Sequence, residues 1–157
     1  MITQFQEYLT FENIYIWTNL AVLPFWFMLA ILPNSRITQI FVNSIIFPLL
    51  LGISYVYVIY QSFLMDEPIL GIFNLYLSLD NLYTVFATES FLLVFWLHFV
   101  AVNLFLGSWV SRDSIKYSIP RGIMIFSLIL IYFTGPVGLV FYWMFRIFYA
   151  KKLGFHD

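Results

Sequence analysis

The chain has 157 residues, of which 62% are hydrophobic and 10% are charged, and its formal net charge is −1 at pH 7. Soluble globular domains carry about 25% charged residues, so this chain lacks the polar surface that would cover a water-soluble particle of its size. The near-neutral charge argues against nucleic acid, which calls for a basic face. With no cysteine, disulfides, Cys-zinc sites and thiol nucleophiles are excluded. We therefore predict an all-α integral membrane protein.

Four apolar stretches are long enough to cross the hydrocarbon core, which needs about 20 residues of helix. The first stretch contains Pro24, which lipid tolerates when neighbouring groups satisfy the freed carbonyl, and it stops at Pro33-Asn34. The first twelve residues hold two glutamates and no Lys or Arg, unlike a cleavable signal peptide. We predict a polytopic bundle of about four transmembrane helices in a single domain over 1–157. The predicted spans are 14–32, 44–65, 89–110 and 119–146.

A segment of intermediate polarity, residues 71–87, separates the second and third spans. It is too polar for a span and too apolar for a free loop. Its apolar residues Leu75, Leu79, Leu82 and Phe86 fall at helical spacing, which predicts a short helix in the headgroup layer. A covered loop is the alternative interpretation.

The fourth stretch is too long for a straight crossing, because about 30 residues of helix reach roughly 45 Å. Near its middle stands "TGPVG", residues 134–138. Pro136 removes an N–H, and Gly135 and Gly138 loosen the backbone or allow close packing. The sequence is compatible with one tilted, kinked helix and with two half-helices that enter and return on the same side of the membrane. We predict the single helix; the returning form would place all seven Lys and Arg residues on one side.

The sequence lacks the catalytic motifs of most familiar enzyme classes. It has no glycine-rich phosphate loop, no nucleophile elbow and no Cys cluster. With only His98 and His156, it cannot assemble a histidine-rich di-iron site. An enzyme built on this chain would use acid–base chemistry, geometry or a borrowed cofactor, and no cofactor or metal is evident.

His98 lies nine residues into the third span, where ionisable groups are costly and face a bundle interior. We expect it to face inward, as a structural hydrogen-bonding group, a ligand-pocket residue, or a pigment or metal ligand. Asn103 lies about 140° away around the helix and would pair with another helix. Gly107, one turn later, permits close helix contact.

The residues around this helix add further candidates. Arg112 and Asp113 follow its predicted end, where a surface ion pair or headgroup contact is the alternative to a catalytic role. Trp96 and Trp109 would anchor the membrane interfaces or line a pocket. In "LPFWF", residues 23–27, Pro24 stands beside two aromatic rings and would shape a groove for a flat apolar ligand, or serve helix packing.

Three segments together resemble the small membrane proteins of the abscisic-acid-deficient-four-like family. They are "NLAVLPFWFMLAILPNSRIT", "WLHFVAVNLFLGSWVSRD" and "SIPRGIMIFSLILIYFTGPVGLVFYWMFR", and they cover most of the chain in order. The most specific pieces are Trp-x-His with a following Gly-x-Trp, and Gly-Pro-x-Gly-Leu. The resemblance implies a role in xanthophyll metabolism, where the family is linked to the formation of neoxanthin, an allenic carotenoid, from violaxanthin.

The resemblance also implies which positions form the site. Two positions depart from the family pattern, because Asn103 stands where Asp is usual and Ser108 where a basic residue is frequent. The first departure weakens a mechanism that uses that acid as a proton donor. The positions carried over by the resemblance are Pro24, Trp26, Trp96, His98, Asn103, Gly107, Trp109, Gly135, Pro136 and Gly138. Arg112 and Asp113 join His98 and Asn103 as catalytic candidates.

We therefore predict a carotenoid-handling membrane protein, isomerase-like or accessory in xanthophyll formation. Opening an epoxide to an allene needs an acid at the oxygen and a base at a nearby proton, with His98 as the best candidate. The alternative is a non-catalytic structural or pigment-binding subunit of a larger photosynthetic complex. Expected partners are membrane lipid, a carotenoid or other long apolar ligand, and other membrane subunits, but no nucleic acid. A bacterial inner, thylakoid or plastid membrane is the expected location.

Overall fold

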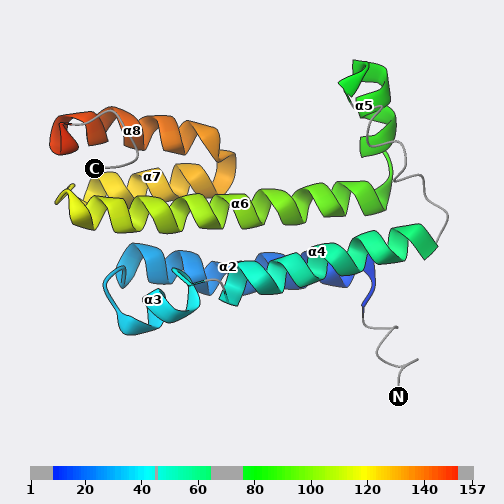
Figure 1. The fold of residues 1–157 in the computed structure, drawn as a ribbon, viewed down its shortest axis with the longest axis horizontal. Helices are drawn as coiled ribbons and strands as arrows, with labels where there is room; N and C mark the ends of the chain where they lie inside the picture. The colour runs from blue at the N-terminus through cyan, green and yellow to red at the C-terminus, as the bar shows by residue number, and fades with distance from the viewer. Residues whose placement is uncertain (1–8, 45, 65–75, 152–157) are drawn as a thin grey trace. The chain divides into compact units, whose positions relative to one another are not determined.

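The computed structural model describes residues 9–44, 46–64 and 76–151, and within these ranges every regular element is a helix. The all-α class is thus confirmed for the described part of the chain. The helices follow one another as shown in Figure 1. They are α2 (Phe11–Ile31), α3 (Arg36–Phe41), α4 (Ile46–Leu64), α5 (Leu79–Phe86), α6 (Glu89–Lys116), α7 (Arg121–Thr134) and α8 (Pro136–Ala150).

The chain divides into two compact units. The first unit takes residues 1–21 and 49–99, and the second takes residues 22–48 and 100–157. Three helices, α2, α4 and α6, contribute residues to both units. The single domain predicted from sequence stays a prediction, and each unit is described by itself.

Two described helices, α2 and α6, are long and apolar enough to cross a membrane. Three shorter apolar helical stretches accompany them, namely residues 49–62 of α4, α7 and α8. The first three predicted spans are helices with bounds close to those expected. Four membrane crossings are not confirmed, because length and composition identify only two such helices among the described residues.

The first unit has a core of apolar side chains from three helices. Ile14 of α2, Val58 of α4, and Leu93 and Leu97 of α6 pack together, and each is at most 6% exposed. Burying aliphatic side chains of this size contributes about 1.5–3 kcal/mol each. This cluster therefore holds α2, α4 and α6 to one another within the first unit.

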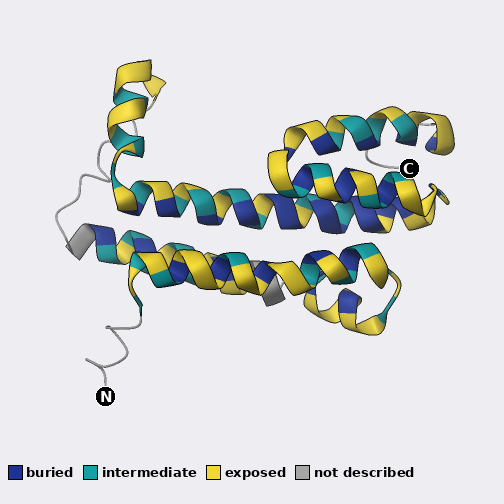
Figure 2. Cartoon of the chain, turned by 180° about the vertical axis from the view of Figure 1, so that it is seen from behind, coloured by how far each residue is buried: buried dark blue, intermediate teal, exposed yellow. Residues whose placement is uncertain are grey.

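The short helix predicted within 71–87 is confirmed over α5. Ser78 caps it by accepting a hydrogen bond from the Asn81 backbone N–H at 3.1 Å. None of its residues is buried (Figure 2), and Phe86 packs edge-on against Phe91 and Phe95 of α6. Leu75 lies outside the described residues, and the placement of α5 in the headgroup layer stays a prediction.

In the second unit, α3 is a six-residue helix that the sequence pattern does not predict. Ser35 caps it, accepting from the Thr38 N–H at 3.1 Å, and the buried Thr38 hydroxyl donates to the Leu32 carbonyl at 2.6 Å. These bonds bring the chain around directly after α2. A helix this short has too few residues to show a hydrophobic period.

The prediction of one continuous helix over 119–146 is wrong. The segment forms a hairpin in which α7 and α8 lie side by side, joined at Gly135 (Figure 1). Pro136 cannot donate to the helical ladder, and Gly135 has a φ of +60°, a backbone conformation that favours glycine. Both effects fall at the same place, so the chain turns instead of kinking.

Gly138 allows the two helices of this hairpin to approach closely. A Cβ atom at Gly138 would overlap the backbone nitrogen of Ile131 and would lie 2.6 Å from the Ile131 Cγ1 atom. At the start of this hairpin, Pro120 occupies the N-cap of α7 without a side-chain cap bond, and Ser118 has a φ of +52°. The hairpin returns the end of α8 toward the start of α7.

We expect Gly135→Ala and Gly138→Ala each to lower the free energy of unfolding by about 1–3 kcal/mol. At Gly135 the cost comes from the positive φ and from the Asn103 Oδ1 atom, 2.6 Å from the added carbon. At Gly138 it comes from the backbone of Ile131. Gly122→Ala, where a Cβ meets nothing within 4 Å, is the control. Thermal unfolding in detergent measures the difference, and equal midpoints for all three variants would contradict the hairpin.

Candidate functional site

A buried ion pair joins α6 to α8 in the second unit. Asp113 Oδ2 accepts hydrogen bonds from Arg146 Nε and from the Tyr142 hydroxyl, each at 2.7 Å, and Arg146 Nη2 lies 3.3 Å from Asp113 Oδ1. Arg146 and Tyr142 have no exposed surface, and Asp113 is 8% exposed. Burial of a charge is costly unless the charge is paired and hydrogen-bonded, so each group depends on the other two.

Aromatic rings surround the guanidinium of this cluster. The Arg146 Cζ atom lies 4.7 Å from the ring centroid of Trp143, 5.0 Å from Tyr117 and 5.8 Å from Trp109. Trp109 also stacks on Trp143 at 5.8 Å with an interplanar angle of 17°. Cation–π attraction replaces part of the hydration that burial removes. Trp109 therefore forms a wall of the ion-pair cluster.

The contacts of Asp113 correct one sequence interpretation. A surface ion pair between Arg112 and Asp113 is wrong, because Asp113 faces inward to Arg146, whereas Arg112 is exposed and its Nε lies 3.4 Å from the Ser108 carbonyl oxygen. Consecutive helical residues point about 100° apart, so one can be buried while the other faces outward.

Tyr142, Trp143 and Arg146 are site residues that the sequence pattern did not identify. One signal was available, since Arg146 is the only charged residue between Arg121 and Lys151. A lone charge in such an apolar segment requires a partner. The partner could not be named from sequence, because the prediction of a continuous helix placed Arg146 far from Asp113.

Asn103 lies against the turn between α7 and α8. It is 4% exposed, and its Oδ1 atom lies 2.6 Å from the position that a Cβ of Gly135 would take. Its Nδ2 atom has no hydrogen-bond partner among the described residues. A buried donor without an acceptor costs about 1–3 kcal/mol, so this amide is a polar group that the described part of the second unit does not satisfy.

The expectation that His98 faces inward is wrong. His98 belongs to the first unit and is exposed, as are Leu92 and Phe95, which precede it at three-residue spacing on α6. The buried face of this half of α6 instead carries Leu93 and Leu97. The spacing puts His98 on the outer stripe of the helix.

An apolar groove of about 330 Å³ lies between α2 and α7 in the second unit. Trp26 forms part of it and meets Tyr132 edge-on, with ring centroids 5.5 Å apart. Trp26 also covers Gly107, where a Cβ would lie 2.8 Å from the indole ring. The lining residues are apolar or aromatic: Leu23, Trp26, Phe27, Ala30, Ile31, Ile125, Leu128, Ile129, Tyr132 and Phe133.

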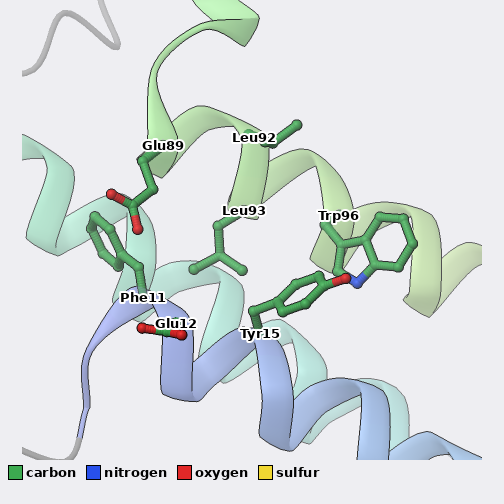
Figure 3. A pocket seen from close by; sticks show the side chains of 7 residues that line it. All are labelled: Phe11, Glu12, Tyr15, Glu89, Leu92, Leu93 and Trp96. Atoms are coloured by element: carbon green, nitrogen blue, oxygen red, sulfur yellow. The ribbon is translucent and has the colours of Figure 1, made fainter.

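A second pocket, of about 440 Å³, lies between the starts of α2 and α6 in the first unit (Figure 3). Trp96 and Tyr15 lie next to each other in it, with ring centroids 5.8 Å apart. The Trp96 Nε1 donates to Asn19 Oδ1 at 3.1 Å. Glu12 and Glu89 bring carboxylates to this pocket, which makes it unlike the apolar groove.

The predicted ligand-binding residues do not share one site. Trp26 lines the apolar groove and covers Gly107, Gly135 and Pro136 form the α7–α8 turn, and Trp109 belongs to the ion-pair cluster. Pro24 is exposed on α2, and Trp96 lines the pocket of the first unit. Among residues 9–44, 46–64 and 76–151, no group of three or more His, Asp or Glu residues could hold a metal ion.

A known protein family matches most of this chain. The family model described as ABA4-like, ABA DEFICIENT 4-like, matches residues 13–142. The protein "ABA DEFICIENT 4, chloroplastic" from Arabidopsis thaliana is 30% identical over 122 residues, which is 76% of this chain and 54% of that protein. The chain thus spans about half the length of this relative. No solved structure matches it.

Breaking the buried ion pair is expected to destabilise the protein strongly. Arg146→Met leaves the Asp113 carboxylate buried without its cation, so we expect a loss of about 3–5 kcal/mol of unfolding free energy. Arg112→Gln removes an exposed cation from the residue beside Asp113 and should change stability by less than about 0.5 kcal/mol. Urea unfolding in detergent measures both.

A double-mutant cycle with Asp113→Leu and Arg146→Met extends the test. The double variant should be more stable than the sum of the two single losses implies, because no charge is left unpaired. Additive losses would show that the two groups do not depend on each other.

His98→Ala should leave both stability and pigment retention unchanged in carotenoid-producing cells, because the exposed imidazole lies outside the apolar core of the first unit. The matched comparison is Leu97→Ala, which removes a buried side chain and should cost about 2–5 kcal/mol. Loss of pigment or product in His98→Ala with unchanged stability would restore this residue as a site candidate.

Proposed function

The chain belongs to the ABA DEFICIENT 4-like family, and from this premise we propose that it is an integral membrane protein that binds a carotenoid during xanthophyll formation. Xanthophyll formation is the role that the resemblance of its three segments implies. Residence in a plastid, thylakoid or bacterial inner membrane is part of the proposal. The chloroplastic name of the relative is consistent with the first of these locations.

The observation that carries this proposal is the apolar groove between α2 and α7. A carotenoid is a rigid apolar rod, and sites for such ligands are concave and lined mainly by hydrophobic and aromatic side chains. Trp26 and Leu128 are buried at 9% and 2% exposure, whereas Phe27 and Phe133 are 64% and 71% exposed. The groove thus has a buried floor and exposed aromatic edges, open to an apolar ligand.

The surface of α2 supports placement of this groove in a membrane. Leu23, Phe27 and Ile31 are 36%, 64% and 58% exposed on the part of this helix that belongs to the second unit. Large apolar side chains exposed at this density are unfavourable in water, whereas lipid solvates them without cost. A carotenoid dissolved in the bilayer would reach the groove from the side.

The role proposed here is binding and positioning, and an isomerase-like step is a further part of the proposal that needs a proton donor and acceptor beside the ligand. Tyr132 is the one residue of the described groove lining whose side chain carries a hydroxyl. Asp113 is engaged by Arg146 and Tyr142, and His98 is exposed in the first unit. Tyr132 is therefore the residue of the groove best suited to meet an oxygen-bearing end of the ligand.

We expect Trp26→Leu to lower carotenoid retention about two- to tenfold, since an aromatic contact of this kind is worth about 0.5–1.5 kcal/mol. Trp17→Leu, which changes an exposed Trp of the same helix, is the control and should retain pigment. The measurement is the absorbance of pigment per protein after purification from carotenoid-producing cells.

Two outcomes would contradict the proposal. One is a purified protein that carries no carotenoid in any form. The other is equal retention in Trp26→Leu and Trp17→Leu at equal thermal stability. The carotenoid composition of the cells, measured with and without the protein, tests the isomerase-like step separately.

A further inference from the structure

We propose that the second unit binds the headgroup of an anionic membrane lipid in a pocket beside the apolar groove. The pocket has a volume of about 430 Å³ and is formed by the loop after α2, the end of α6 and the start of α7. Arg121 is the only charged residue in its described lining. Asn34, Ser35 and Ser118 add polar side chains to the same lining. The proposal does not depend on carotenoid binding.

Arg121 is placed to meet an anion. Its side chain is exposed, and Nη2 donates to the Ile31 carbonyl at the end of α2. A guanidinium has five N–H donors in a fixed fork, so one bond to a carbonyl leaves donors for a phosphate oxygen. The bond to Ile31 also fixes the guanidinium between α2 and α7, where it lines the pocket.

The basic residues of the sequence are concentrated in the second unit. All seven Lys and Arg residues of the sequence belong to segments of this unit. The hairpin brings the end of α8 back to the end of α6, as the pair between Arg146 and Asp113 shows. Exposed cations described there are Arg36, Arg112, Lys116, Arg121 and Lys151.

Acidic side chains do not offset this charge within the described part of the unit. Asp113 is the only acidic residue there, and it is buried against Arg146. Arg36 directly follows Ser35, and Lys116 directly follows Ile115, two residues of the pocket lining. Basic residues next to a membrane surface attract anionic lipids. Each basic residue within about one Debye length of the headgroup adds to the affinity for the lipid.

A lipid fits this place better than a soluble anion. Ile31 lines both the polar pocket and the apolar groove, so the two hollows adjoin at this residue. Ile31 and Ile115 are 58% and 41% exposed beside the pocket. A ligand with a charged head and an apolar chain meets both surfaces, whereas inorganic phosphate meets only the polar one.

The test is a titration of the purified full-length protein in neutral detergent, with bound lipid counted by native mass spectrometry. The three probes are phosphatidylglycerol, phosphatidylcholine with the same acyl chains, and inorganic phosphate. We expect tighter binding of phosphatidylglycerol than of phosphatidylcholine. Arg121→Gln should weaken phosphatidylglycerol binding about fivefold, which is more than it weakens phosphatidylcholine binding, while Arg121→Lys should retain most of the affinity.

Lys151→Gln is the matched control, because it removes an equal charge outside the pocket lining and should weaken binding less than Arg121→Gln. Equal binding of both lipids, or an equal loss in Lys151→Gln and Arg121→Gln, would overturn the pocket. Displacement of the lipid by an equal concentration of phosphate would overturn the choice of a lipid. If thermal unfolding shows that Arg121→Gln is not folded, Asn34→Leu in the pocket lining replaces it. Asn34→Leu should weaken phosphatidylglycerol binding more than Lys151→Gln does, and an equal loss in the two variants would overturn the pocket.

Discussion

The pairing of Asp113 with Arg146 inside the second unit constrains how the last third of the chain can fold. Neither charge tolerates burial alone, and together with the Tyr142 hydroxyl they satisfy one another at hydrogen-bond distance. The pair requires the end of α8 to lie beside the end of α6. Because α7 comes between them in the chain, that is achieved only if the chain reverses after α7. Gly135 and Pro136 provide the reversal, so the ion pair and the turn depend on each other.

Helix α7 of this hairpin decides what the second unit presents to a ligand. It lies against the second half of α2, where the apolar groove forms around Trp26 and Tyr132. Its first residue, Arg121, meets the carbonyl of Ile31. An apolar groove beside a basic pocket is suited to binding an apolar pigment and the headgroup of an anionic lipid. Both proposals therefore involve α7, which lines the groove and the pocket.

Particular residues show where sequence reasoning succeeded and where it failed. The short helix α5 was predicted because leucines and Phe86 recur at helical spacing. His98 was placed inward on the argument that a membrane-embedded imidazole needs protein around it, but Leu93 and Leu97 occupy the buried face of α6 and leave His98 on the exposed one. Asp113 was assigned to the surface because it adjoins a predicted helix end, whereas α6 extends beyond that end to Lys116. In each failure the missing information was which face of a helix has a neighbour.

The sequence by itself determined the all-helical class, the approximate bounds of the first three long helices and the family, because composition, apolar run length and motif order are local properties. Only the tertiary structure decided that "TGPVG" is a turn, that Arg146 is buried, and that Trp26 rather than Trp109 lines the groove. Each of these depends on contacts between residues distant along the chain. A period of 3.6 residues identifies a helix, but the partner that covers each face is fixed by packing and by the pairing of buried charges.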